Sequence, residues 1–111
     1  MSAAHCRLAI YGTLAPGRVN HHEVAMIPGI WRHGTVRGQL HPHGWGAALG
    51  YPAIELDPAG PEVAVQVLER ASLPEHWTRL DAFEGEGYRR EVCEVDLGGE
   101  IIAASIYVLN R

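Results

Sequence analysis

The sequence predicts an α+β fold built around a highly curved sheet or a small β-barrel. Several short segments have the apolar runs or the alternation that are typical of strands. One of these segments carries internal glycines that bend a strand, and a single segment has a convincing helical pattern. The chain has 111 residues, which suits one hydrophobic core, so we expect a single domain over residues 1–111.

Strands are expected where a short apolar or alternating run is bounded by turn residues. The first four runs are Arg7–Tyr11, Ile30–Leu40, Ala53–Leu56 and Val63–Leu68. The second of them should be bent or bulged because it contains glycines. Two further runs, Arg90–Leu97 and Ile101–Leu109, flank Gly98-Gly99 and predict a β-hairpin. In the loop after the first run, Asn20 is a candidate cap for a short helix that ends before Pro28.

The convincing helix extends from Leu73 to about Phe83. Ser72 is its expected N-terminal cap, and Pro74 lies in the first turn, where proline is tolerated. Its apolar residues fall on one face, so this helix should pack against the sheet.

Glu84 falls in the middle of the apolar face of this helix, at its C-terminal end. A carboxylate there is partly desolvated, so we expect a raised pKa and the ability to act as a general base. A second interpretation is a structural glutamate that swings outward at the helix end or pairs with Arg89 or Arg90. Asp81, at the edge of the same face, is a weaker candidate.

The composition argues against several classes of protein. The formal net charge is -4, and the nine basic residues, all arginine, are scattered along the chain, so a nucleic-acid surface is not predicted. No apolar run approaches the ~20 residues of a membrane span. The first residues lack the pattern of an export signal, so we expect a cytoplasmic protein in which Cys6 and Cys93 are reduced, buried thiols. The sequence does not indicate an oligomeric state.

A glycine turn, Tyr11-Gly12-Thr13-Leu14, follows the first predicted strand directly. Glycine lets the backbone approach a ligand closely, and the outward-pointing amide groups of such a turn can bind carboxylates and carbonyl oxygens. The alternative is a plain turn that ends a strand. Because the turn is neither GxGxxG nor a P-loop, a nucleotide ligand is not indicated.

These segments together resemble the γ-glutamylcyclotransferase-like family, which includes small AIG2-like and YtfP-like proteins. Its members carry a Tyr-Gly-Ser/Thr-Leu loop after the first strand, matched here by Tyr11–Leu14. They also carry a later Leu-Asp-x-Phe/Tyr-Glu-Gly segment and a Tyr-x-Arg segment, matched by Leu80–Gly85 and Tyr88–Arg90. A middle Tyr-Pro-Ala/Gly segment is matched within Gly50–Ile54, so the resemblance covers nearly the whole chain.

The resemblance implies a small β-barrel flanked by short helices, with a cavity at one end. It also implies cyclisation of a γ-glutamyl amine or amide to 5-oxoproline, with release of the amine and without a metal or other cofactor. The catalytic glutamate of the family corresponds to Glu84. The glutamyl or 5-oxoproline part of the ligand would be held by backbone amides of Tyr11, Gly12, Thr13 and Leu14. Tyr88 would line the pocket, and Arg90 would orient a carboxylate or pair with a strand neighbour.

One departure from the family pattern leaves the substrate open. Members often have Gly-Glu in the strand before the helix, where this chain has Val65 and Gln66, so Val65 is expected to narrow or reshape the cavity. An alternative function is therefore a module that binds a small carboxylate metabolite in the same cavity without turnover. A second alternative is a related acyl-transfer enzyme that acts on γ-glutamyl amides with the same residues.

The seven histidines do not predict a metal site. His21-His22 and His41-Pro42-His43 are close pairs, but neither has a carboxylate or cysteine at a recognised metal-ligand spacing. They are expected to be surface or loop residues. Cys93, within an alternating strand, is expected to be structural rather than nucleophilic.

Overall fold

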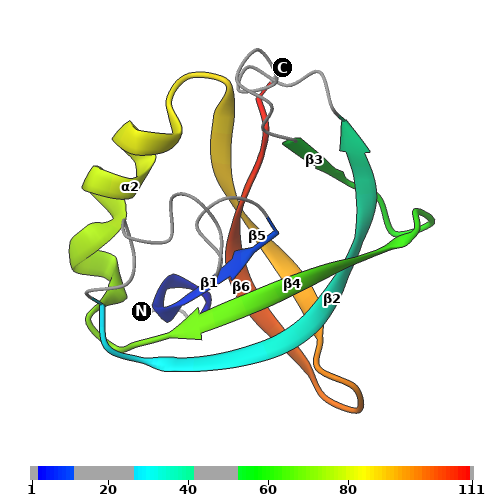
Figure 1. Ribbon diagram of the computed structural model, residues 1–111, viewed down its shortest axis with the longest axis horizontal. Coiled ribbons are helices and arrows are strands. Elements are labelled where there is room, and N and C mark those ends of the chain that lie inside the picture. Colours follow the sequence, from blue (N-terminus) through cyan, green and yellow to red (C-terminus); the bar gives the residue numbers. More distant parts are fainter. Residues whose placement is uncertain (1–2, 12–26, 42–52, 111) are drawn as a thin grey trace.

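The computed structural model describes residues 3–11, 27–41 and 53–110. These residues form short helices and six strands, which are shown in Figure 1. They are η1 Ala3–Cys6, β1 Arg7–Ile10, β2 Ile30–His41, β3 Ala53–Leu56, β4 Glu62–Glu69, η3 Leu73–His76, α2 Trp77–Glu84, β5 Tyr88–Asp96 and β6 Ile101–Leu109. All six strands predicted from the sequence, including the two of the hairpin, are present, which confirms the α+β class.

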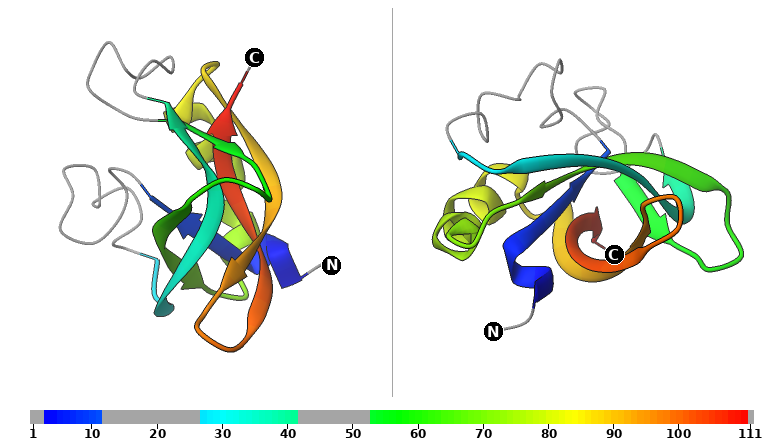
Figure 2. Two further views of the ribbon diagram at one scale, coloured as in Figure 1. Left: turned by 90° about the vertical axis from the view of Figure 1, so that its right-hand side faces the viewer. Right: turned by 90° about the horizontal axis from the view of Figure 1, so that it is seen from below.

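The strands form a closed barrel. Its order is β1-β4-β2-β3-β6, and the ring closes because β6 pairs in parallel with β1 as well as with β3. The sixth strand, β5, pairs with β6 along its whole length and touches β2 at one pair, Thr35 opposite Asp96. Figure 2, in the view from below, shows β2 and β4 arching over β6. The closed ring confirms the predicted β-barrel and hides most strand edges.

The β5–β6 hairpin is regular, with one register from Tyr88 opposite Leu109 to Asp96 opposite Ile101. Its turn uses Gly98 and Gly99, whose φ angles of 91° and 143° are ones that other residues rarely adopt. The Asp96 carboxylate accepts a hydrogen bond from the Gly98 amide at 2.7 Å. The predicted hairpin is thereby confirmed.

Two hydrophobic clusters lie on opposite sides of the sheet. The first fills the barrel and is built from all six strands. The second lies between the outside of the barrel and the helices, where Leu8 and Leu68 meet Leu73, Trp77 and Leu80. Figure 1 shows α2 beside the barrel, in the position that this second cluster requires. The helix therefore covers the barrel with its apolar face, as its sequence pattern predicts.

The predicted helix from Leu73 to about Phe83 is divided into two parts. It begins as the 3₁₀ turn η3 and continues as α2, which ends at Glu84. The expected cap at Ser72 is wrong, since its side chain makes no capping hydrogen bond. With φ -88° and ψ 4°, Ser72 lacks the extended backbone that aims a capping oxygen at the helix, and its hydroxyl accepts a bond from Arg70 instead.

The glycines of β2 permit close contact rather than a bulge. Pairing with β4 keeps one register from Ile30 to Arg37, so β2 bends without an extra residue. A Cβ added to Gly34 would lie 2.6 Å from Val95 Cγ1 and 2.9 Å from the Asp96 carbonyl oxygen. The absence of a side chain at this position lets β5 reach β2 and complete the contact between them.

Some sequence-based expectations lie outside the described residues. They are the helix after Asn20, the turn from Pro42 to Gly46, and the histidines of the first close pair. Within the described ranges, no helix is long and apolar enough to cross a membrane.

The close contact at Gly34 predicts that Gly34→Ala destabilises the fold. The new methyl group must push against Val95 and the Asp96 backbone, a type of overpacking that costs about 1–3 kcal/mol. Gln39→Ala, at an exposed position of the same strand, should change the free energy of unfolding by less than about 0.5 kcal/mol. Urea unfolding of the wild-type protein and of both variants measures these changes in the free energy of unfolding. Equal stabilities of the two variants would contradict the packing described.

Candidate active site

Glu84 lies at the junction between α2 and β5. The helix ends there because Gly85 adopts a positive φ of 81°, and the Gly85 amide donates to the Asp81 carbonyl oxygen at 3.1 Å. The chain then turns at once into β5, with the Tyr88 amide donating to the Gly85 carbonyl oxygen at 3.3 Å. This tight connection holds Glu84 close to the first residue of β5.

The Glu84 carboxylate is half-buried, and burial raises its pKa from 4.5 to about 7. No donor among the described residues forms a hydrogen bond or ion pair with it. The alternative of pairing with an adjacent arginine does not hold, because Arg89 pairs with Glu91 at 2.6 Å and Arg90 pairs with Asp81 at 3.0 Å. A group with this pKa is both a competent proton acceptor and a competent donor at neutral pH.

Tyr11 connects the end of β1 to two other strands. Its hydroxyl donates to the Tyr107 carbonyl oxygen at 2.6 Å and accepts from the Ile54 amide at 3.1 Å. Burial raises the pKa of Tyr11 far above its ordinary value, and the charge of nearby Glu84 adds a smaller increase. The end of β1 and the end of α2, which are distant in the sequence, therefore lie close together.

Of the other residues predicted to hold a ligand, Gly12, Thr13 and Leu14 lie outside the described residues. Tyr88 is half-buried at the start of β5 and packs against the cluster beneath α2. Ionisation of Tyr88 would raise the pKa of Tyr11, so the two hydroxyl groups interact electrostatically. Tyr88 on β5 and Glu84 on α2 thus both influence Tyr11, which directly follows β1.

Arg90 has a partner that the sequence did not indicate. Its Nε and Nη2 atoms donate to the two carboxylate oxygens of Asp81, at 3.0 and 3.2 Å, and its guanidinium lies 4.4 Å above the Trp77 ring. The Tyr107 hydroxyl donates to the same carboxylate at 2.6 Å. Burial alone would raise the pKa of Asp81, but the hydrogen bonds from Arg90 and Tyr107 outweigh it and lower that pKa.

Sequence reasoning missed Tyr107 because it lies inside an apolar run and has no motif of its own. A usable signal was present: in an alternating hairpin, Arg90 and Tyr107 are cross-strand neighbours, and their register confirms this. Two donors from the hairpin could therefore have been expected to reach the same acceptor on the helix.

Val65 is buried inside the barrel, with 3% of its surface exposed. In the chain it comes one residue before Gln66, which pairs with Ile10, so it lies next to the end of β1. Its side chain occupies interior space near that end, where a glycine would leave room.

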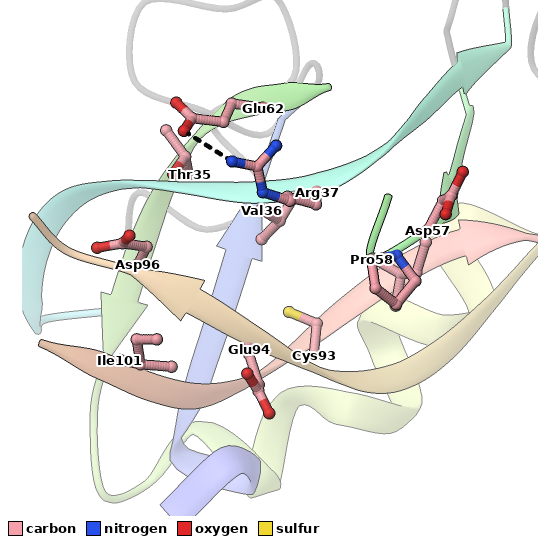
Figure 3. Close-up of a pocket in the computed structure, with 11 residues that line it drawn as sticks. Thr35, Val36, Arg37, Asp57, Pro58, Glu62, Cys93, Glu94, Asp96 and Ile101 are labelled. Atoms are coloured by element: carbon pink, nitrogen blue, oxygen red, sulfur yellow. Dashed lines mark hydrogen bonds and ion pairs between the residues drawn. The ribbon is translucent and has the colours of Figure 1, made fainter. Parts of the chain in front are cut away.

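The described residues also line a cavity of 480 Å³ away from Glu84, shown in Figure 3. It lies between β2, the C-terminal end of β3 and the C-terminal half of β5, and it includes none of the predicted site residues. Figure 3 shows Arg37 paired with Glu62 and Glu94 pointing away from β2, so its charged groups do not converge. Burial, with a further contribution from Glu94, raises the pKa of the Cys93 thiol at its floor to about 12, which makes a nucleophilic role there unfavourable.

No metal-binding group of three or more histidine, cysteine, aspartate or glutamate side chains occurs within residues 3–11, 27–41 and 53–110. His41 pairs with Glu55 at 3.2 Å, and Cys6 and Cys93 are both free thiols.

The chain is similar to a family of known proteins. The family model described as gamma-glutamyl cyclotransferase, AIG2-like, matches residues 8–111. A comparison with curated proteins found no match.

Solved structures share the fold. YkqA from Bacillus subtilis is 28% identical with a TM-score of 0.72; the match covers 99% of this chain but 36% of YkqA, so the chain spans about a third of that protein. An AIG2-like protein from Mus musculus is 21% identical with a TM-score of 0.69, over 93% of this chain and 76% of that one. A gamma-glutamyl cyclotransferase is 15% identical with a TM-score of 0.59, over 95% and 66% respectively. At the two lower identities the likeness is one of fold.

The raised pKa of Glu84 predicts that Glu84→Gln changes how stability depends on pH. The folded protein holds the proton more tightly than the unfolded chain, so this stabilisation is full below pH 4.5 and is lost as the pH rises through about 7. Relative to the glutamine variant, the wild-type protein should lose roughly 1–3 kcal/mol between about pH 4.5 and pH 8. Urea unfolding of both proteins across this range measures the difference, in which other titrating groups cancel. Parallel stability curves would show that Glu84 titrates as an exposed carboxylate.

Proposed function

Because the chain belongs to the gamma-glutamyl cyclotransferase, AIG2-like family, we propose that it cyclises a γ-glutamyl amine or amide to 5-oxoproline and releases the amine. The observation that carries this proposal is Glu84, a half-buried carboxylate with a pKa of about 7, close to the end of β1. Membership of the family supports the reaction class, and the environment of Glu84 supports its role as the proton carrier.

The proposed reaction takes place within one substrate molecule. The α-amine of the glutamyl unit attacks the γ-carbonyl carbon, a new C–N bond closes a five-membered ring, and the original amide C–N bond breaks. Because nucleophile and electrophile belong to the same molecule, folding the substrate into the reactive shape supplies much of the rate increase. No electron transfer occurs in this step, and it requires no co-reactant.

Glu84 would move the proton in this reaction. The α-amine is an ammonium at neutral pH and must lose a proton before it can attack, and the leaving nitrogen must gain one. With a pKa of about 7, roughly half of the Glu84 population can accept a proton at neutral pH, and the protonated form is a strong enough acid to return it. A carboxyl with the ordinary pKa of 4.5 would be a much weaker base.

Substrate binding is assigned to the segment that follows β1. Backbone amides of Tyr11, Gly12, Thr13 and Leu14 would hold the α-carboxylate or polarise the γ-carbonyl oxygen. The Tyr11 hydroxyl is already used by Tyr107 and Ile54, so we assign its contribution to the main chain rather than to the phenol. Tyr88, at the start of β5, would form part of the pocket wall.

One observation supports a second candidate function. Val65 fills interior space beside the end of β1, and a smaller cavity favours a compact carboxylate ligand over a long γ-glutamyl amide. The same site would then bind a small acid without turnover. A related acyl transfer to another acceptor would use the same residues and would differ in its product.

The proposed role of Glu84 predicts that Glu84→Gln nearly abolishes turnover. The glutamine keeps the shape of the side chain but cannot carry the proton, so kcat should fall by about 100-fold or more. The assay incubates the protein with a panel of γ-glutamyl amines and γ-glutamyl amino acids and detects 5-oxoproline by chromatography. Glu86→Gln, two residues further at an exposed position, is the matched control and should keep wild-type turnover.

Three results would count against the proposed reaction or the proposed role of Glu84. Wild-type turnover by the Glu84→Gln protein would exclude Glu84 as the proton carrier. Binding of small acids in calorimetry, with no product from any amide, would favour the binding function. A γ-glutamyl product other than 5-oxoproline would favour acyl transfer.

A further inference from the structure

The last turn of α2 is attached to the barrel mainly through one carboxylate. The buried residues of this helix, Trp77 and Leu80, lie in its first half. The following residues, from Asp81 to Phe83, are exposed, and none of them belongs to either hydrophobic cluster. Glu84 therefore belongs to a turn that the hydrophobic cluster does not hold, although its own position is half-buried.

Asp81 supplies the missing attachment. It accepts two hydrogen bonds from Arg90 on β5 and one from the Tyr107 hydroxyl on β6, at 3.0, 3.2 and 2.6 Å. The paired geometry of the guanidinium and the carboxylate fixes orientation as well as distance. Arg90 is held in turn by its position 4.4 Å above the ring of Trp77, on the same helix.

We propose that Asp81 and Arg90 are positioning residues, which lock the last turn of α2 onto the β5–β6 hairpin and so hold Glu84 in place. This inference rests on the proposed function for its catalytic consequence. An eight-residue helix is marginal by itself, and a side chain one turn beyond its last buried contact needs a second anchor. The bonds to Asp81 provide that anchor three residues before Glu84.

This role replaces the substrate-binding role expected for Arg90. Two of its nitrogen atoms already donate to Asp81, and its flat face covers Trp77. To bind a substrate carboxylate, the guanidinium would have to leave both partners. A bound substrate carboxylate would also compete with the Asp81 carboxylate for the Arg90 guanidinium, since both groups carry the same negative charge.

The pair also balances charge around Glu84. Tyr11 just after β1, Tyr88 on β5 and Tyr107 on β6 lie in this region, and the charges of Asp81 and Glu84 both raise the pKa of Tyr107. While the ion pair is intact, the negative charge of Asp81 is offset by Arg90. Removing one member leaves the charge of the other uncompensated about one helical turn from Glu84.

The kinetic test compares Asp81→Asn, Arg90→Gln and the double variant. If the two residues act as one anchor, each single change should lower kcat by about tenfold with KM within about threefold, because a displaced catalytic group costs rate rather than binding. The double variant should be no slower than the slower single variant. If Arg90 binds substrate directly, Arg90→Gln raises KM strongly while Asp81→Asn does not, and that result would overturn the proposal.

The matched control is Arg89→Gln. Arg89 precedes Arg90 on β5 and forms an ion pair with Glu91 of the same strand at 2.6 Å. Its loss should change kcat by less than about twofold, since exposed surface pairs contribute little. A tenfold loss in this control would mean that any charge change on β5 has the same effect, which would remove the support for a specific anchor.

A substrate-free test separates this inference from the proposed reaction. Amide hydrogen exchange followed by NMR should show the Gly85 amide, bonded to the Asp81 carbonyl oxygen, exchanging about tenfold faster in both single variants, with the Val67 amide in the barrel unchanged. If no γ-glutamyl compound yields 5-oxoproline, the proposed function fails, and these exchange rates alone decide the inference. Unchanged exchange at Gly85 would overturn it.

The titration midpoint of Glu84, followed through its carboxyl carbon, gives a second measurement. A purely structural role would not shift this midpoint in opposite directions in the two charge variants. Asp81→Asn leaves the Arg90 charge uncompensated and should lower the titration midpoint of Glu84, whereas Arg90→Gln should raise it, each by roughly 0.5. Tyr107→Phe, which removes one hydroxyl, is the milder variant should a charge variant fail to fold, and it should accelerate Gly85 exchange less. Shifts in the same direction for both charge variants would contradict the arrangement.

Discussion

The arrangement of this site depends on two carboxylates that lie one helical turn apart and have opposite environments. Asp81 receives hydrogen bonds from Arg90 and Tyr107 and has a lowered pKa, whereas Glu84 receives none from the described residues and has a raised one. Bonding stabilises the charged form of the first, and burial disfavours the charged form of the second. The same short helix thus carries one residue suited to holding structure and one suited to moving protons.

The closed barrel brings these groups to the end of β1. Parallel pairing of β6 with β1 places the end of β1 next to the C-terminal half of β6, and the antiparallel hairpin places the start of β5 beside it. The Tyr11 hydroxyl then links β1 to β6 and β3 through two hydrogen bonds. As a result, the charge of Glu84 contributes to the raised pKa of Tyr11, although most of the chain separates the two residues.

The features that were predicted correctly from the sequence are those that depend on the local residue pattern. Alternation and the Gly98-Gly99 turn predicted the hairpin, and the helical wheel placed Glu84 on the covered face of its helix. The prediction failed where neighbours distant in sequence decide the outcome. Ser72 does not cap the helix because its backbone is not extended, and the partner of Arg90 is known only once α2 lies against the hairpin. Barrel closure likewise depends on β6 pairing with β1, which no periodicity reports.

The role of Glu84 as the proton carrier is tested most directly by titrating this residue in the wild-type protein and following the ¹³C chemical shift of its side-chain carboxyl carbon. We expect one transition for this carbon with a midpoint at about 7, in keeping with a half-buried carboxylate. A midpoint at the ordinary value of 4.5 would place the side chain in bulk water and would remove the basis for Glu84 as the proton carrier.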